Sequence, residues 1–274
     1  MPTVAHISDL HFGRVDPVAL AALSAALRRL TPDLTIVTGD LTQAGRRAEF
    51  LDASTFLKSV DGGVLAVPGN HDTPVFNVGA RFLDPWGRFR RLIGRENMSV
   101  AELDGLTVIG LNSARRAAPR LNWAFGTLSR RDIASAANVA RDAAPHTAVV
   151  VAMHHPVVLG PGVAGSETVG RAELALRTFR EAGVSAVFTG HVHVSKAAPI
   201  DAVGGRMLSF GAGSAISGRQ RGEPPSFFFI SSRRWNVDPI ECVTYALAEK
   251  RFEAVRRQSF ARAADVWMQT DEVD

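Results

Sequence analysis

Five apolar runs in this sequence each end in side chains that can bind a metal ion or a proton. One of them, Val64-Leu65-Ala66-Val67, leads directly into Gly69-Asn70-His71-Asp72. A single turn of this kind is ordinarily explained by Asn and Asp side chains that satisfy nearby backbone amides. Its repetition at five strand-like ends constrains the fold, because it requires a sheet that carries these groups at its strand termini.

The first third of the chain alternates between strand and helix patterns. Apolar runs at 4–8, 34–38 and 64–67 predict strands, and apolar residues at helical spacing predict helices over 17–30 and 46–60. This alternation is typical of a parallel sheet with right-handed crossovers. In such sheets, sites form beyond the carboxyl ends of the strands. Asp9, His11 and Asp40 are therefore expected near the turn at 69–72.

The rest of the chain predicts a broken helical excursion over 74–100, a β-hairpin over 98–111 and a buried central strand over 148–153. Towards the C-terminus, short antiparallel strands are expected at 207–210, 227–231, 240–247 and 252–260. The last two form a hairpin in this interpretation, and a helix over 243–262 is the competing prediction. With no convincing linker, residues 1–274 are expected to form a single domain, with antiparallel strands at about 240–262 and a short frayed tail over 271–274.

The strand ends together supply carboxylate, amide and imidazole groups. They are Asp9, His11, Asp40, Asn70, His71, His154, His155, His191 and His193, and they include six of the eight histidines. Any one histidine is more simply explained as a satisfied core or turn residue. As a group, unpaired carboxylates and imidazoles are costly to bury without a cation. We therefore interpret the cluster as a metal site.

Composition excludes several other classes of protein. The apolar runs of this chain are too short to cross a bilayer, and its start has no signal-peptide pattern. The single cysteine, Cys242, rules out an internal disulfide and suits a cytoplasmic protein. A net charge of +4 favours anionic partners in general but does not by itself imply nucleic acid. A homo-oligomer stays open.

The motif set Asp9-x-His11, Gly39-Asp40, Gly69-Asn70-His71-Asp72, His154-His155-Pro156 and Gly190-His191-x-His193 resembles that of the calcineurin-like metallophosphoesterases. The resemblance runs from residue 4 to about 230. His-His-Pro and the stretch 221–227 look like the bacterial branch that includes class III cyclic-nucleotide and glycerophosphodiester phosphodiesterases. The resemblance implies an α/β fold in which two mixed sheets form a central β-sandwich flanked by helices, a four-layer α/β/β/α arrangement.

The resemblance also implies two divalent metal ions, and ligand type alone leaves Mn, Fe, Co and Zn open. One ion is expected on Asp9, His11 and His193, the other on Asn70, His154 and His191, with Asp40 bridging both. His155 is expected to support a ligand rather than to bind metal. Asp72 either orients a neighbour by hydrogen bonding or only forms the turn, and these alternatives are equally open.

The expected reaction is the hydrolysis of a phosphodiester, of cyclic nucleotide or glycerophosphodiester type, by a metal-bridging hydroxide. His71 is expected to act as general acid or to stabilise the transition state. The alternatives are a phosphomonoesterase or a nucleotide-linked pyrophosphohydrolase, and less favoured are a nuclease or a non-catalytic scaffold. A serine hydrolase using Ser113 or Ser214 lacks the Gly-x-Ser-x-Gly signature. Specificity is expected from residues 74–100, from the loops 113–126 and 156–168, and from Arg206, Arg219 and Arg221.

Overall fold

The fold is described from a computed structural model of the chain, which covers all residues except 76, 116–123, 144–146, 160–167, 203, 219–221, 264–265 and 274. The helices and strands alternate through the first 67 residues and strands dominate after residue 183. Their order is β1 (Thr3–Ile7), α1 (Pro17–Leu30), β2 (Leu34–Thr38), α2 (Arg47–Lys58), β3 (Gly63–Val67), the 3₁₀ helix η1 (Asn70–Asp72), α3 (Val78–Leu83), α4 (Gly87–Leu92), β4 (Met98–Leu103), β5 (Leu106–Leu111), α5 (Arg130–Asp142), β6 (Ala148–Ala152), α6 (Ala172–Glu181), β7 (Val184–Thr189), β8 (Lys196–Ala202), β9 (Gly205–Gly211), β10 (Ser226–Ser231), β11 (Ile240–Ala248), β12 (Arg251–Ala263) and β13 (Val266–Val273).

The strands form two facing layers, as the resemblance to the metallophosphoesterases implies. The order along the hydrogen-bonded path is β3-β2-β1-β10-β11-β12-β13-β9-β7-β6-β5-β4, with β8 paired to β9. Strand β13 joins the layers: it pairs with β12 over most of its length but with β9 only at Val266 and Arg206. The pairs β1–β2, β2–β3, β5–β6, β6–β7 and β7–β9 are parallel, so both layers are mixed.

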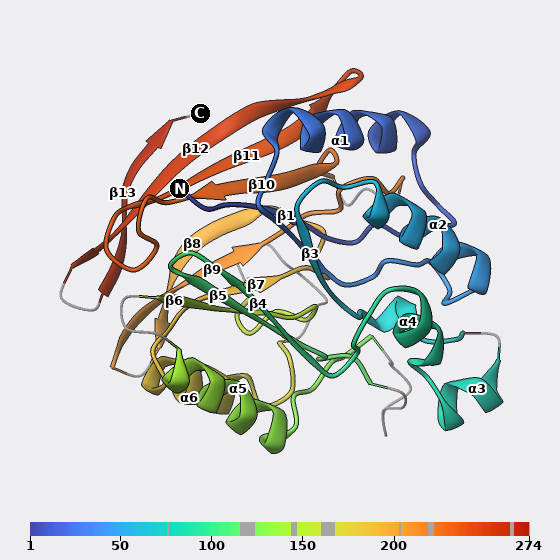
Figure 1. Cartoon of the computed structure of the whole chain (residues 1–274), viewed down its shortest axis with the longest axis horizontal. Helices are drawn as coiled ribbons and strands as arrows, with labels where there is room; N and C mark the ends of the chain where they lie inside the picture. Colours follow the sequence, from blue (N-terminus) through green and yellow to red (C-terminus); the bar gives the residue numbers. More distant parts are fainter. Residues whose placement is uncertain are drawn as a thin grey trace.

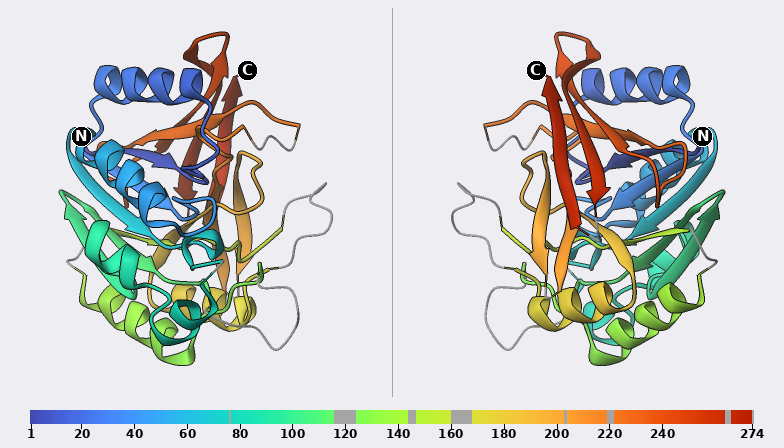
Figure 2. Two further views of the ribbon diagram at one scale, coloured as in Figure 1. Left: turned by 90° about the vertical axis from the view of Figure 1, so that its right-hand side faces the viewer. Right: turned by 90° about the vertical axis from the view of Figure 1, so that its left-hand side faces the viewer.

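Three apolar clusters hold the layers together. Side chains from both sheets fill the space between them, among them Phe188, Phe210 and Phe228. Helices α1 and α2 cover the outer face of one sheet, and α5 and α6 cover the outer face of the other, each with its own apolar cluster. Figures 1 and 2 show the two helix pairs on opposite sides of the strands. The fold is the expected four-layer α/β/β/α sandwich.

Local sequence explains where the first helix begins. The side chain of Asp16 accepts hydrogen bonds from the backbone N–H groups of Val18 and Ala19, and Pro17 takes the first helical position. Leu23 and Leu27 lie one turn apart and are both buried against the sheet. The crossover from β1 to β2 therefore returns the chain beside the strand it left, and both strands end at the same edge.

The C-terminal region confirms one prediction and corrects another. Residues 240–248 and 251–263 form the antiparallel hairpin β11–β12, so the competing helix over 243–262 is wrong. The expected frayed tail is also wrong for residues 271–273, which pair with β12 as part of β13; Asp274 lies outside the described residues. The edge of β12 that does not pair with β11 would otherwise leave backbone N–H and C=O groups unpaired, and residues 266–273 pair with it. The single-domain organisation stays a prediction.

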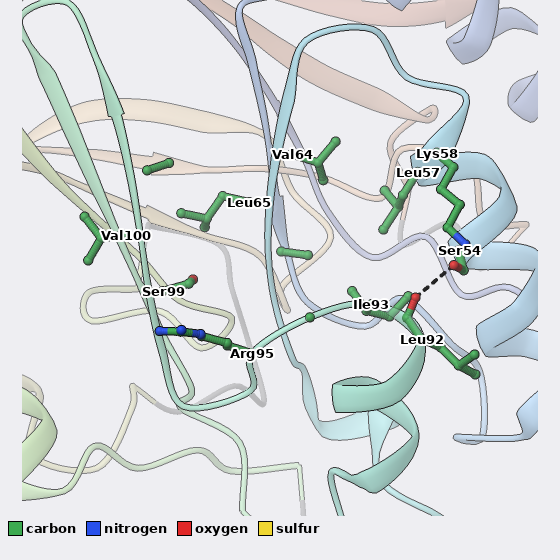
Figure 3. A pocket seen from close by; sticks show the side chains of 13 residues that line it. Ser54, Leu57, Lys58, Val64, Leu65, Leu92, Ile93, Arg95, Ser99 and Val100 are labelled. Atoms are coloured by element: carbon green, nitrogen blue, oxygen red, sulfur yellow. Dashed lines mark hydrogen bonds between the residues drawn. The ribbon is translucent and has the colours of Figure 1, made fainter.

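The two ends of the strand path, β3 and β4, leave a hollow of about 270 Å³ between them. Figure 3 shows Val64 and Leu65 on one side of it and Ser99 and Val100 on the other, with the Ser54 hydroxyl bonded to the Leu92 carbonyl at its rim. No residue predicted for the metal site lines it. This hollow therefore lies apart from the strand ends that carry the polar groups. Among the described helices, none is long and apolar enough to span a membrane.

Candidate metal centre

The strand ends bring the predicted residues together. Asp9 and His11 follow β1, Asp40 follows β2, Asn70 and His71 lie in η1 after β3, and the remaining histidines follow β6 and β7. Five of these residues have left-handed backbone with φ of 49–73°: Asp9, His11, Asp40, His191 and His193. Such conformations are unfavourable for residues other than glycine and concentrate at functional sites. The surrounding sheet therefore holds these ligand-type side chains in strained turns.

One group of side chains gathers around the carboxylate of Asp9. Its Oδ1 lies 3.0 Å from Nε2 of His193 and 3.8 Å from Nε2 of His11. The two imidazoles approach each other at 3.4 Å between their Nε2 atoms. All three residues are buried. Three ligand atoms thus face one point, as a small cation requires.

A second group gathers around His154. Its Nε2 lies 3.1 Å from Oδ1 of Asn70 and 3.3 Å from Nδ1 of His191. Its other nitrogen, Nδ1, donates to the carbonyl oxygen of Thr38 at 2.7 Å. This bond fixes the tautomer of the neutral ring, and it leaves the Nε2 lone pair directed at the group.

Asp40 lies between the two groups. Its Oδ2 is 3.4 Å from Nε2 of His154 and 3.9 Å from Nε2 of His11. Its Oδ1 accepts the backbone N–H of His71 at 2.8 Å. One carboxylate oxygen therefore faces both groups while the other is held by η1.

Charge and burial set the protonation of the cluster. Burial opposes ionisation of Asp40, but the neighbouring His154 and His71 hold the pKa of Asp40 well below its usual value. Burial works against the cation at His154 too, yet Asp40 raises the pKa of His154 to about 9. Burial lowers the pKa of His11 and of His191 to about 4. At pH 7 the carboxylates are thus ionised and His11 and His191 are neutral, as metal ligands need to be. His154 holds a proton, which a metal ion bound there would displace.

The residues fit a metal ion by their chemistry. Buried Asp9 Oδ1 accepts no hydrogen bond from the described residues, although two imidazole nitrogens lie within 4 Å of it. Lone pairs of oxygen and nitrogen that face one another are unfavourable unless a cation or proton lies between them. Carboxylate, amide and imidazole ligands without thiolate suit Mn, Fe, Co or Zn. The Asp and His groups therefore fit a metal site.

Glycines allow the turns to approach this closely. A Cβ on Gly190 would lie 1.9 Å from the hydroxyl oxygen of Ser8, and one on Gly69 would lie 2.2 Å from Oδ1 of Asp40. Gly69 has φ of −104°, which any residue can adopt. The reason for glycine at position 69 is therefore the space that Asp40 occupies, and not the backbone conformation.

His155 is placed differently from His154. Its Nδ1 lies 2.9 Å from the hydroxyl of Ser113, and its Nε2 donates to the carbonyl oxygen of Ala124 at 2.9 Å. Burial, and then the neighbouring His154, keep the pKa of His155 well below its usual value. Its nitrogens are also within reach of His154 and His191, but both ring nitrogens already have partners within the protein.

Ser113 and Ser214, which the sequence suggested only as candidate nucleophiles, form hydrogen bonds to residues of the site instead. The Ser113 hydroxyl contacts His155, and the Ser214 hydroxyl donates to the carbonyl oxygen of Asp9 at 2.7 Å. Sequence reasoning missed these roles, and it also missed the carbonyl of Thr38. No sequence signal marks such contacts, because they join positions more than 40 residues apart.

His71 lies at the accessible side of the centre. It is half-buried, its ring meets that of His11 edge to face at 5.0 Å between centroids, and its Nδ1 donates to the carbonyl oxygen of Gln43 at 2.7 Å. Of the arginines expected to set specificity, Arg219 and Arg221 lie outside the described residues, as do most of the loops 113–126 and 156–168. Arg206 pairs with Asp201 at 2.9 Å.

The four-layer sandwich carries Asp and His groups that fit a metal site at its strand ends. The sequence pattern of the family described as calcineurin-like phosphoesterase matches residues 2–195. That match spans more than half of the chain, so the protein belongs to this family. Membership makes it a phosphoester hydrolase by class.

Three comparisons illustrate the likeness. The chain is 26% identical over 214 residues to a Synechococcus protein named probable cyclic nucleotide phosphodiesterase, covering 70% of this chain and 73% of that protein. A dimetal phosphatase from Danio rerio aligns with a TM-score of 0.65 at 15% identity, covering 92% of this chain and 98% of that one. A purple acid phosphatase from yellow lupin aligns with a TM-score of 0.65 at 12% identity over 92% of this chain and about half, 52%, of its own. The structural matches establish the fold.

Proposed function

We propose that this protein is a phosphodiesterase that depends on two divalent metal ions. Asp9, His11 and His193 would hold one ion, and Asn70, His154 and His191 the other. The observation that carries the proposal is the position of Asp40, whose Oδ2 faces His154 at 3.4 Å and His11 at 3.9 Å. A carboxylate in that position can belong to both ligand groups.

When bound, two divalent ions lower the pKa of water and neutralise the negative charge of a phosphate ester. Protein charge sets the sign of the field around them. Two divalent ions carry four positive charges, and Asp9 and Asp40 carry two negative ones, so the net charge is about +2 (4 − 2). This positive charge favours the binding of an anionic ester. The charge count therefore suits a phosphodiester monoanion as substrate.

His71 is the residue that we assign to the leaving group. The Gln43 carbonyl can only accept, so Nδ1 of His71 donates its proton there, and a proton for the leaving group would come from Nε2. A proton delivered to the departing alkoxide oxygen lowers the barrier most for a basic leaving group. The edge-to-face contact with His11 keeps this ring beside the first metal group.

The assignment to diesters rests on the named relative. Its 26% identity extends over 214 residues and covers 70% of this chain. A cyclic nucleotide or a glycerophosphodiester is the substrate type that we expect. The site geometry by itself accommodates the attack on any phosphate ester, so the distinction needs a substrate panel.

The test combines metal analysis with hydrolysis. Purified protein is stripped with a chelator, reloaded with Mn²⁺, Fe²⁺, Co²⁺ or Zn²⁺, and assayed on cyclic AMP, a glycerophosphodiester, a phosphomonoester and a nucleoside diphosphate conjugate. We expect two ions per chain and the highest kcat/KM on a diester. Asp40→Ala should lose activity, whereas Asp52→Ala, on the exposed face of α2, should retain it. Absence of metal-dependent hydrolysis of any ester would refute the proposal, and preference for the monoester would refute its diester part.

A further inference from the structure

A groove of about 400 Å³ lies along the outer face of β8 and β9 and begins at the end of β8 that follows His193. The residues that line it are mainly apolar and come from three segments: Pro156, Val158 and Leu159 after β6; Thr189, Val192 and Val194 at and after β7; and Lys196, Ala198, Pro199, Ile200, Asp201, Ser209 and Gly211 on β8 and β9. At about 30 Å³ per water-sized group, it has room for roughly 13 such groups. All of these lining residues are described.

The side-chain directions place the groove outside the sandwich. Ala197, Leu208 and Phe210 point into the core between the sheets. Successive residues of a strand point to opposite faces, so Ala198 and Ser209 point outward, into the groove. Helix α6 covers the neighbouring part of this face but does not contribute to the lining.

The groove is continuous with the metal centre along the chain. Val192 lines it and lies between His191 and His193, and Pro156 lines it directly after His155. A single short turn, residues 191–193, therefore separates the candidate ligands from an apolar surface. A group attached to a phosphate at the centre would have to pass over this turn to reach the groove.

The charges in the groove are unequal at its two ends. Asp201 at the far end is paired with Arg206. Lys196, at the end near the centre, has no carboxylate within ion-pair distance among the described residues, and it is exposed. The near end thus favours an anion, and the middle of the groove favours an apolar chain or ring.

We infer that this groove binds an apolar arm of the substrate, so that the preferred diester carries an elongated apolar or aromatic substituent on one ester oxygen. The inference rests on the proposed phosphodiesterase function and assigns its specificity. The phosphate would lie at the metal centre, and the arm would run over Val192 onto Ala198 and Ile200. Burial of successive methylene groups in such a groove makes binding stronger with each group added.

The test compares two esters with the same leaving group, p-nitrophenyl methyl phosphate and p-nitrophenyl octyl phosphate, on the Mn²⁺-loaded protein. We expect kcat/KM to be at least about tenfold higher for the octyl ester. Ala198→Trp fills the groove and should reduce that ratio to near one, and Ala198→Leu should reduce it partly. The matched control, Ala101→Trp, places the same side chain at the separate hollow between β3 and β4 and should keep the ratio.

A binding measurement gives a readout that does not depend on turnover. Calorimetry with methyl and octyl esters of methylphosphonic acid should show tighter binding of the octyl compound to wild type and to Ala101→Trp, but not to Ala198→Trp. Thermal unfolding shows whether each variant is folded. If Ala198→Trp is not folded, Ala198→Leu takes its place in the comparison. Equal kcat/KM for both esters in wild type, or a ratio that survives filling of the groove, overturns the inference. Failure of the proposed function appears differently, as no metal-dependent hydrolysis of either ester.

Discussion

The carboxylate of Asp72 accepts the backbone N–H of Thr42 at 2.8 Å and the hydroxyl of the same residue at 2.9 Å. Its other oxygen accepts the N–H groups of Gly69 at 2.9 Å and Leu41 at 3.2 Å. One buried side chain thereby joins the turn after β2 to the turn after β3. These are the turns that carry Asp40 and Asn70, so their spacing depends on Asp72.

Replacement of Asp72 by Asn should destabilise the protein and weaken the metal site. Both carboxylate oxygens accept backbone N–H groups, so the amide of Asn would direct its own N–H₂ at a donor. The loss of a buried acceptor is expected to lower the free energy of unfolding by about 1–3 kcal/mol. Chemical denaturation with and without Mn²⁺ measures both effects. Asp52→Asn, on an exposed face of α2, should change stability by less than about 0.5 kcal/mol; an equally small effect of Asp72→Asn would mean that the two turns are held elsewhere.

His154 and His155 are adjacent in sequence, but we predict that replacing each of them by Ala has a different effect on metal content. His154→Ala removes the nitrogen that faces Asn70 and His191, so the protein should retain one ion fewer per chain. His155→Ala removes the contacts to Ser113 and Ala124, so it should retain two ions, with affinity lowered by no more than about 100-fold. Elemental analysis after equilibration with Mn²⁺ distinguishes them. Loss of an ion from His155→Ala alone would reverse the assignment.

Replacement of His71 by Ala should affect turnover and spare metal binding. We expect kcat to fall by about 10²–10⁴-fold for an ester with an alkoxide leaving group, and much less for one that releases p-nitrophenolate. The reason is that p-nitrophenolate leaves without a proton. A plot of log kcat against leaving-group pKa should therefore be steeper for the variant than for wild type. A uniform loss across leaving groups, together with loss of metal, would assign His71 to the ligands instead.

His6 should make stability depend on pH. Its Nε2 bonds to the Thr38 hydroxyl at 2.9 Å, its ring packs on Phe188, and burial lowers its pKa from 6.5 to about 3. Below pH 6.5 the unfolded chain binds a proton that the folded chain does not, so the free energy of unfolding should fall by up to about 1.4 kcal/mol per pH unit between pH 6.5 and pH 3.

The measurement for His6 is denaturation of wild type and His6→Asn between pH 9 and pH 5. Above pH 7.5 the two pH profiles should run parallel, because the histidine is neutral in both states there. Below pH 6.5 the stability of wild type should fall more steeply than that of the variant. Parallel profiles throughout would mean that His6 becomes protonated in the folded protein.

The fold and the composition of the site were readable from local patterns. The strand and helix spacing up to Val67 predicted the crossovers, and the hairpin over 98–111 was predicted at the bounds of β4 and β5. Residues Asp9, Asp40 and His154 were predicted at strand ends and do converge. This works because the carboxyl ends of parallel neighbours share one edge, so sequence order alone brings their termini together.

Other features depended on contacts between distant segments. The pairing of residues 266–273 with β12, the support of Asp9 by Ser214 and the apolar groove beside Val192 have no local signature. Each arises where side chains or strand edges from separate parts of the chain meet. The sequence by itself therefore determined the chemistry of the centre, because residue type and strand position are local properties. Only the tertiary structure decided what supports that centre and what lies next to it, because those are properties of packing.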